Sequence, residues 1–117
     1  MDEIDVLQAE VMRTLAHPTR LRIIHALARE PLEVGRLAGS LGIIQPNASQ
    51  HLALMRGAGI VEAERTGREV RYRLSDPEVV AACALMRNVL ARRLTRLAGL
   101  SEVALARPVP APATTTR

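Results

Sequence analysis

The spacing of hydrophobic residues along this chain changes twice, and each change marks a different kind of structure. Up to residue 59, and again from residue 76, apolar side chains recur every three or four positions. That spacing is the period of an amphipathic helix. Between residues 60 and 74 apolar and polar side chains alternate, as in a half-buried strand. The pattern therefore predicts a mainly α chain with one small β-hairpin.

Four helices are predicted before the hairpin, over about residues 3–16, 18–29, 33–41 and 45–56. Pro18 suits the first position of the second helix, and Glu30-Pro31 ends it. The last two helices are joined by the short glycine-containing connection 42–44, which is the helix-turn-helix arrangement. The side chains expected to face the core are Leu21, Ile24, Leu27, Ala28, Val34, Leu37, Ala38, Leu41, Ala48, Leu52 and Met55.

The alternating stretch predicts two strands, residues 60–65 and 69–74, around the turn Thr66-Gly67-Arg68. In the second strand Val70, Tyr72 and Leu74 share one side, and the charged residues share the other. A hairpin with an arginine-rich outer face follows from this alternation.

A last helix of about 20 residues is predicted to begin with Asp76 as its cap and Pro77 at its first position. It is longer than one small domain needs for its own core, so we expect it to form a dimer interface together with the first helix. The alternative is that it caps the core of the monomer. The interface residues expected on the two helices are Leu7, Val11, Cys83, Met86, Leu90 and Leu94. Residues 1–98 then form one domain, followed by a flexible Pro/Thr-rich tail, 99–117.

Charge indicates what the chain binds. All sixteen basic residues are arginines, against twelve acids, and four of the arginines lie between residues 65 and 73. A concentrated positive charge favours an anionic partner. Tyr72 is the only aromatic residue, which argues against single-strand recognition by base stacking. With one cysteine, no signal peptide and no long apolar run, we expect a cytoplasmic protein that does not enter membranes.

The fourth predicted helix carries polar side chains opposite its apolar stripe. Side chains of these types contact base edges in a major groove or hold phosphates. The residues expected to contact DNA from this helix are Gln45, Asn47, Ser49, Gln50, His51 and Arg56. On the hairpin, Arg65, Arg68, Arg71 and Arg73 are expected to contact phosphate or an adjacent minor groove. Arg20 and Arg22 are expected either to contact the DNA backbone or to be solvated surface arginines.

Helix, helix, helix-turn-helix, basic hairpin and helix is the order of a winged helix-turn-helix, with about five helices and a two-stranded wing. The segments LAHPTRLRII, LAGSLGIIQPNASQHLALMRGAGIV and RTGREVRYRLSDPEV resemble the ArsR (arsenical-resistance regulator) family over about residues 10–98. The resemblance implies a homodimeric transcriptional regulator, usually a repressor, joined through its first and last helices. Its two recognition helices would enter successive major grooves of a pseudo-palindromic double-stranded operator. Activation is the alternative where the operator lies so as to help polymerase.

The resemblance also implies a signal that releases DNA, because many members respond to a metal, a metalloid or an oxidant. The segment 32–37 lacks the paired cysteines of the arsenic, cadmium and lead sensors. Asp76 matches the first ligand position of the zinc sensors, but Glu78, Val89 and Arg92 stand where other ligands are expected. No cofactor is therefore certain.

Three hypotheses for the signal follow from the residues. His17 or His25 could join the acidic N-terminus in a nickel or zinc site, whereas Asp76 and Glu78 alone make a poor one. Cys83 is either a small buried hydrophobe or half of an intersubunit thiol pair for oxidation or a soft metal. The last hypothesis is regulation by abundance or by a partner protein, a co-regulator.

Two other classes of function fit the sequence less well than DNA binding. An enzyme is not expected, because Ser49 and His51 lie too close on one helix for a triad and no acid is placed to orient the histidine. A winged helix that docks a protein is the other alternative, but the arginines of the wing favour DNA.

Overall fold

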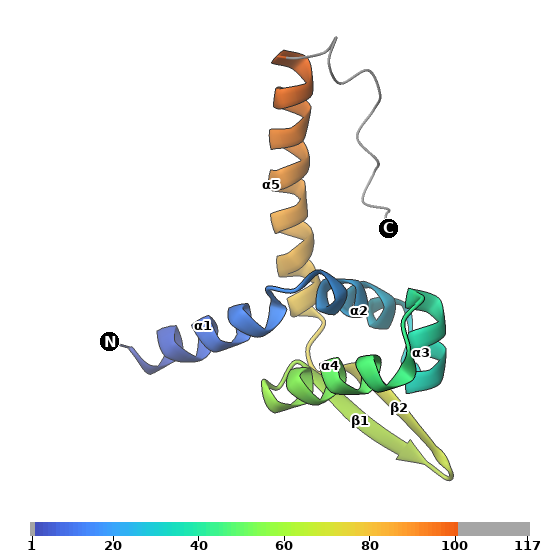
Figure 1. Ribbon diagram of the computed structural model, residues 1–117. Helices are drawn as coiled ribbons and strands as arrows, with labels where there is room; N and C mark the ends of the chain where they lie inside the picture. The colour runs from blue at the N-terminus through green and yellow to red at the C-terminus, as the bar shows by residue number, and fades with distance from the viewer. Residues whose placement is uncertain (1, 101–117) are drawn as a thin grey trace. The chain divides into compact units, whose positions relative to one another are not determined.

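The computed structural model describes residues 2–100, with only the backbone of Leu100. Within them it contains the helices α1 (Glu3–Leu15), α2 (Pro18–Arg29), α3 (Val34–Leu41), α4 (Gln45–Gly57) and α5 (Glu78–Leu100). The strands β1 (Val61–Thr66) and β2 (Glu69–Leu74) form an antiparallel hairpin that follows α4 in the sequence (Figure 1). This arrangement confirms the predicted winged helix-turn-helix. Most of the predicted tail, 99–117, lies outside the described residues.

The chain divides into two compact units, Met1–Pro77 and Glu78–Arg117. The first unit holds α1 to α4 and the hairpin; the described part of the second is α5. The core of the first unit is aliphatic. Its buried side chains are Ile23, Ile24, Leu27, Leu37, Ala38, Ala48, Leu52, Met55, Ile60 and Val61. They come from α2, α3, α4 and the entry into β1, so these four segments hold one another in place.

On α2, Ile24 and Leu27 are buried as predicted, and Leu21 is half-buried. Ile23 is fully buried, whereas Ala28, which was expected to be inside, is exposed. Ala28 lies in the last turn of α2, one residue before the helix ends at Arg29. On α3 only Leu37 and Ala38 are buried, and Val34 and Leu41 at its two ends are half-buried.

The connection from α3 to α4 is tight because of Gly42. This residue adopts a φ of 70°, in the left-handed region that glycine enters without steric cost. Its N–H donates to the carbonyl of Gly39 at 3.3 Å, and the N–H of Ile43 donates to the carbonyl of Ala38 at 3.0 Å. These bonds satisfy carbonyls at the end of α3. They fix the direction in which α4 leaves the turn.

The hairpin is tied to the helices by a bridge that the sequence pattern did not reveal. Leu32, between α2 and α3, exchanges two backbone hydrogen bonds with Tyr72 of β2, at 3.1 and 2.8 Å. As predicted, Val70, Tyr72 and Leu74 are half-buried while the alternate residues of β2 are exposed. The hairpin therefore extends from the body with its inner side anchored and its charged side in solvent.

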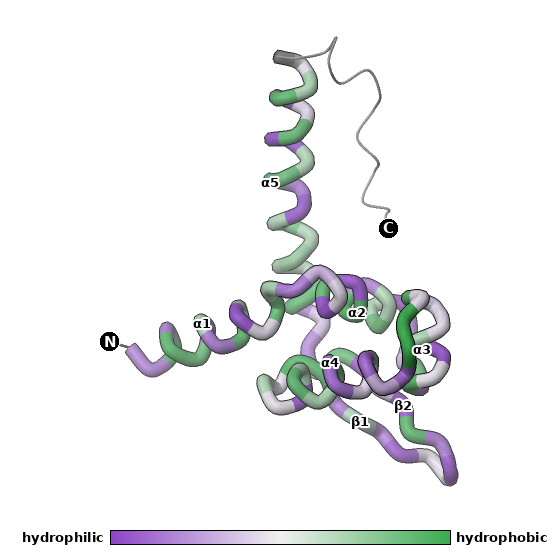
Figure 2. The backbone as a smooth tube through the Cα atoms, in the orientation of Figure 1, coloured by the Kyte–Doolittle hydropathy of each residue, from purple (hydrophilic) through white to green (hydrophobic). Residues whose placement is uncertain are grey.

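Helices α1 and α5 expose their hydrophobic residues in the single chain. No side chain of α1 is buried, and Leu7 and Met12 are about half exposed. On α5 the residues Met86, Leu90 and Leu94 are exposed as well. Figure 2 shows hydrophobic positions recurring along both helices. No helix in the described part of the chain is long and apolar enough to cross a membrane.

The start of α5 differs from the prediction. The helix begins at Glu78, and Asp76 and Pro77 precede it rather than serving as its cap and first residue. The fixed φ of proline suits a turn as well as a first helical position, so the sequence alone did not set the boundary. The predicted length is confirmed, with 23 residues in α5.

Candidate nucleic-acid interface

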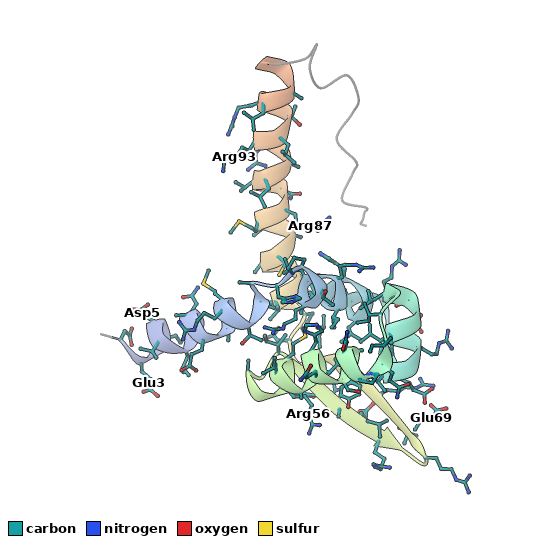
Figure 3. The ribbon with its side chains drawn as sticks, viewed as in Figure 1. Glu3, Asp5, Arg56, Glu69, Arg87 and Arg93 are labelled. Atoms are coloured by element: carbon teal, nitrogen blue, oxygen red, sulfur yellow. The ribbon has the colours of Figure 1, made fainter. Side chains whose placement is uncertain are left out.

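Helix α4 has one buried face and one exposed face. Ala48, Leu52 and Met55 are buried against the rest of the first unit. The other side carries the predicted outward-facing residues, and five of them are exposed. These are Gln45, Asn47, Ser49, Gln50 and Arg56. Arg56 projects from α4 in Figure 3. The helix thus presents amide, hydroxyl and guanidinium groups from a backbone that the core holds rigidly.

The sequence predicted that His51 faces outward like these residues, but its side chain is less exposed than theirs. It is half-buried, and its Nδ1 accepts a hydrogen bond from Nε of Arg20 at 3.2 Å. Its ring lies 4.7 Å from that of His17, measured between centroids. Arg20 also donates from Nη1 to the carbonyl of Thr14 at 2.9 Å. Arg20 therefore links α1, α2 and α4 and is not simply a solvated surface arginine, whereas contact with the DNA backbone stays a prediction.

No pattern in the sequence could have revealed this contact, because Arg20 and His51 are 31 positions apart. The position of His17, by contrast, could be anticipated, because it directly precedes Pro18 at the predicted start of the second helix. Its Nδ1 accepts from the N–H of Thr19 at 3.1 Å and caps α2. Arg22, the other arginine considered for the DNA backbone, donates to the carbonyl of Leu41 at 3.0 Å.

The surroundings of His51 oppose a positive charge on its ring. Burial lowers the pKa of His51 from its usual value, and the charges of His17 and Arg20 lower it further. A ring nitrogen that accepts a hydrogen bond carries no proton. Protonation of Nδ1 would therefore break the bond from Arg20. The neutral ring is the form that holds α4 to the α1–α2 junction.

Gln45, at the start of α4, lies against α3. A side chain on Gly35 would place its Cβ 3.4 Å from Oε1 of Gln45. This separation is an ordinary van der Waals contact, so the amide of Gln45 lies beside α3 without needing a glycine there.

The wing arginines fall into two pairs with different surroundings. Arg73 lies 2.8 Å from Glu62 and 3.8 Å from Glu64, and Arg71 lies 3.0 Å from Glu69. Within residues 2–100, Arg65 and Arg68 form no ion pair. The strand register explains part of the difference, because it places Glu62 opposite Arg73 but Val70 opposite Arg65. The charge count over residues 65–73 included only one acid, Glu69. It therefore missed Glu62 and Glu64 of β1, which partly neutralise Arg73.

The candidate residues for sensing a signal are not brought together. In the described part of the chain, no three residues of the types His, Cys, Asp and Glu are grouped closely enough to hold a metal ion. His17 lies beside His51, and His25 is half-buried on α2. Asp76 and Glu78 are exposed at the beginning of α5. Two imidazoles whose Nδ1 atoms already accept hydrogen bonds do not make a four-ligand zinc site.

Cys83 is half-buried on α5 and forms no disulfide. Burial raises the pKa of the Cys83 thiol, and the nearby Arg87 opposes this with a smaller effect. The thiolate is the reactive form of cysteine, so a raised pKa makes Cys83 less reactive toward oxidants and metals.

A helix-turn-helix with an exposed polar second helix, followed by an arginine-bearing hairpin, defines a winged helix-turn-helix DNA-binding regulator. The model of the bacterial regulatory protein arsR family matches residues 17–63. The chain belongs to this family of transcriptional regulators, which are not enzymes.

The chain is 40% identical to the uncharacterised HTH-type transcriptional regulator Rv0081 of Mycobacterium tuberculosis, over 83% of this chain and 87% of the relative. The crystal structure of that protein superposes with a TM-score of 0.73, over 82% of this chain and 97% of the other. The homodimeric winged helix-turn-helix domain of Mb0332 from Mycobacterium bovis also gives 0.73, at 30% identity, over 80% and 86% of the two chains. The HTH-type transcriptional repressor SmtB of Mycobacterium tuberculosis is 45% identical over 57% of this chain and 50% of that protein.

Proposed function

We propose that this regulator is a homodimeric repressor that binds a pseudo-palindromic operator through α4 and the wing of each subunit. The observation that carries the proposal is the division of α4 into a buried apolar face and an exposed face of amide, hydroxyl and guanidinium groups. Gln45, Asn47, Ser49, Gln50 and Arg56 contact bases or phosphates in the major groove. His51 is proposed to support this surface through its bond to Arg20.

The wing contributes contacts to the DNA backbone. Arg65 and Arg68 are proposed as the principal phosphate ligands, because neither is neutralised by a glutamate within the described chain. Arg71 and Arg73 must first leave Glu69, Glu62 and Glu64, so their contribution is smaller. Exposed ion pairs contribute about 1 kcal/mol or less, so these arginines can exchange a glutamate for a phosphate at little cost.

The two copies are proposed to meet through α1 and α5. Both helices expose hydrophobic residues, including the predicted interface residues Leu7, Met86, Leu90 and Leu94, while Val11 and Cys83 are half-buried. The helices also carry opposite charge: α1 contains three acids and one arginine, and α5 contains one acid and four arginines. Glu3 and Asp5 on α1, and Arg87 and Arg93 on α5, are labelled in Figure 3. Apolar faces with complementary charge favour pairing of α1 with α5 between subunits. The homodimeric state of Mb0332 supports the proposal that this chain forms a dimer.

Repression is proposed because SmtB, which is 45% identical over 57% of this chain, is a transcriptional repressor. The signal that ends repression is proposed to act on the α1–α5 interface, since loss of the dimer separates the two recognition helices. A thiol switch at Cys83 is the less favoured form of this signal, because burial raises the pKa of the thiol and keeps it protonated. Nickel or zinc remains a candidate effector, and it would need ligands from more than one element or from both subunits.

The decisive experiment is selection of bound sequences from a random duplex pool by the full chain, followed by affinity measurements on the selected site. A two-fold symmetric site with half-site centres about 10 bp apart is expected. The variant Gln50→Ala should lose discrimination at one position of each half-site, whereas Arg36→Ala on α3 is the control. Selection of no sequence at any salt concentration would contradict the proposed function. Native mass spectrometry of the same protein with nickel, zinc or an oxidant tests for an effector.

A further inference from the structure

Two adjacent isoleucines in the turn before α4 have opposite surroundings. Ile43 is half-buried, and its N–H donates to the carbonyl of Ala38 at 3.0 Å. Ile44 is the residue that caps the N-terminus of α4, and its side chain is 63% exposed. The turn therefore directs one of the two side chains inward and the other into solvent, at the beginning of the helix proposed to contact DNA.

The stability of the fold does not explain an isoleucine at position 44. A capping side chain stabilises a helix by accepting a hydrogen bond from a backbone N–H of its first turn, and serine, threonine, aspartate or asparagine is preferred there. Ile44 provides no such bond; only its backbone carbonyl accepts, from Asn47 and Ala48 at 3.1 and 3.2 Å. Exposure to water also disfavours a large aliphatic side chain. A polar residue at position 44 would both cap the helix and avoid exposing an aliphatic side chain to water.

The exposed hydrophobic residues of the first unit are not scattered. Apart from those on α1, the large ones in the described residues up to Pro77 are Ile44 and Leu54, at the two ends of α4. In helix-turn-helix proteins it is the N-terminal part of the recognition helix that contacts base edges. Ile44 lies at that end, next to Gln45. The apolar group that base pairs offer in the major groove is the 5-methyl of thymine.

We propose that Ile44 packs against the 5-methyl group of a thymine in each half-site and thereby selects a T·A pair at that position. This inference rests on the proposed function and adds to it an apolar, rather than hydrogen-bonded, element of sequence recognition. In the complex, the contact with the methyl group offsets the helix cap that Ile44 does not provide.

The test removes the methyl group and nothing else. In the selected operator, each thymine is replaced in turn by deoxyuridine, symmetrically in the two half-sites, and the affinity of the full chain is measured. At one thymine position we expect the dissociation constant to rise about fourfold per half-site, which corresponds to one methyl group buried in a contact. The variant Ile44→Ser should bind the thymine and deoxyuridine duplexes equally, and Ile44→Val should keep most of the difference.

A second measurement separates this role from a structural one. Ile44→Ser supplies a capping hydroxyl, so its melting temperature should be higher than that of the unmodified chain while its affinity for the operator is lower. Leu54→Ala, at the other end of α4, is the control and should leave the thymine dependence unchanged.

Three outcomes would count against the inference. If no deoxyuridine substitution weakens binding, or if Ile44→Ser keeps the same thymine dependence, the contact with the methyl group does not exist and the proposed function still stands. If the chain selects no DNA sequence at all, the proposed function fails and this inference fails with it.

Discussion

The leucines of α4 and α5 illustrate how differently the two compact units use the same residue type. Leu52 of α4 is 1% exposed, whereas Leu90 of α5 is 46% exposed, although each belongs to an apolar stripe at helical spacing. The first stripe is covered by other elements of the same chain. The second, like the stripe of α1, is not. A hydrophobic stripe thus shows that a helix must pack, but it does not identify the surface that covers it.

The largest effect is expected from removing a buried leucine. Leu52→Ala should lower the free energy of unfolding by about 2–5 kcal/mol, because it leaves a cavity beneath α4. Chemical denaturation monitored by circular dichroism measures the change. It should be the same at all protein concentrations, since the cavity lies within one chain. A change below about 1 kcal/mol would show that α4 is not held by this core.

The matched change on α5 should act on assembly instead of on the fold of the chain. Leu90→Glu places a charge in the proposed interface, so the dimer should dissociate to monomers and operator affinity should fall at least 100-fold. Sedimentation equilibrium and DNA titration measure the two effects. The stability of the unmodified, dimeric chain should depend on protein concentration, whereas the stability of the monomeric variant should not. Ala84→Glu, also exposed on α5 but outside the stripe, is the control. If the Leu90→Glu variant remains dimeric, the apolar stripe of α5 does not form the dimer interface.

The opposite charges of α1 and α5 offer a sharper test of which helices meet. Reversal of Asp5 to Arg should weaken the dimer about tenfold, and so should reversal of Arg93 to Asp, because each leaves like charges facing one another. The double variant should recover most of the affinity between subunits if the two residues are close across the interface. Additive effects would mean that these two positions are not neighbours, and the same cycle would then be made with Glu3 and Arg87.

On the DNA-binding side, the two kinds of wing arginine should differ in salt dependence. Arg68→Ala should reduce the slope of log K against log salt by about 0.9 for each phosphate that the arginine neutralises. Arg71→Ala should reduce it less, because Arg71 is paired with Glu69 in the free protein. Affinity for nonspecific DNA should fall together with affinity for the operator in both variants. Equal slopes for the two variants would show that the ion pair has no influence on binding.

The smallest effect concerns pH. The pKa of His51 is lower in the folded chain than the usual value of about 6.5, so between these two values the unfolded chain binds more protons. Stability is therefore fully present above pH 6.5 and declines as the pH falls toward the lowered pKa. Thermal unfolding from pH 7.5 to 5 measures this. His51→Asn offers Arg20 an acceptor that does not titrate, and it should flatten the decline. An unchanged pH profile would show that His51 is not the responsible group.

The helices and strands of this protein, and their order, could be predicted from local patterns in the sequence. Hydrophobic spacing located the helices and both strands, and Pro18 and Gly42 marked a helix start and a helix end because their backbone restrictions are local. The exposed face of α4 followed from the same spacing. Local rules were sufficient for these features because each depends on residues a few positions apart.

Which side chains and backbone groups meet became known only from the packed structure. The contact of Arg20 with His51, the bridge of Leu32 to Tyr72 and the pairing of Arg73 with Glu62 all join residues that are distant along the chain. Each depends on how elements pack or on strand register, and hydrophobic spacing carries no information about either. The same limit applied at Ile44, whose exposure became evident only when the turn placed Ile43 inward and Ile44 outward.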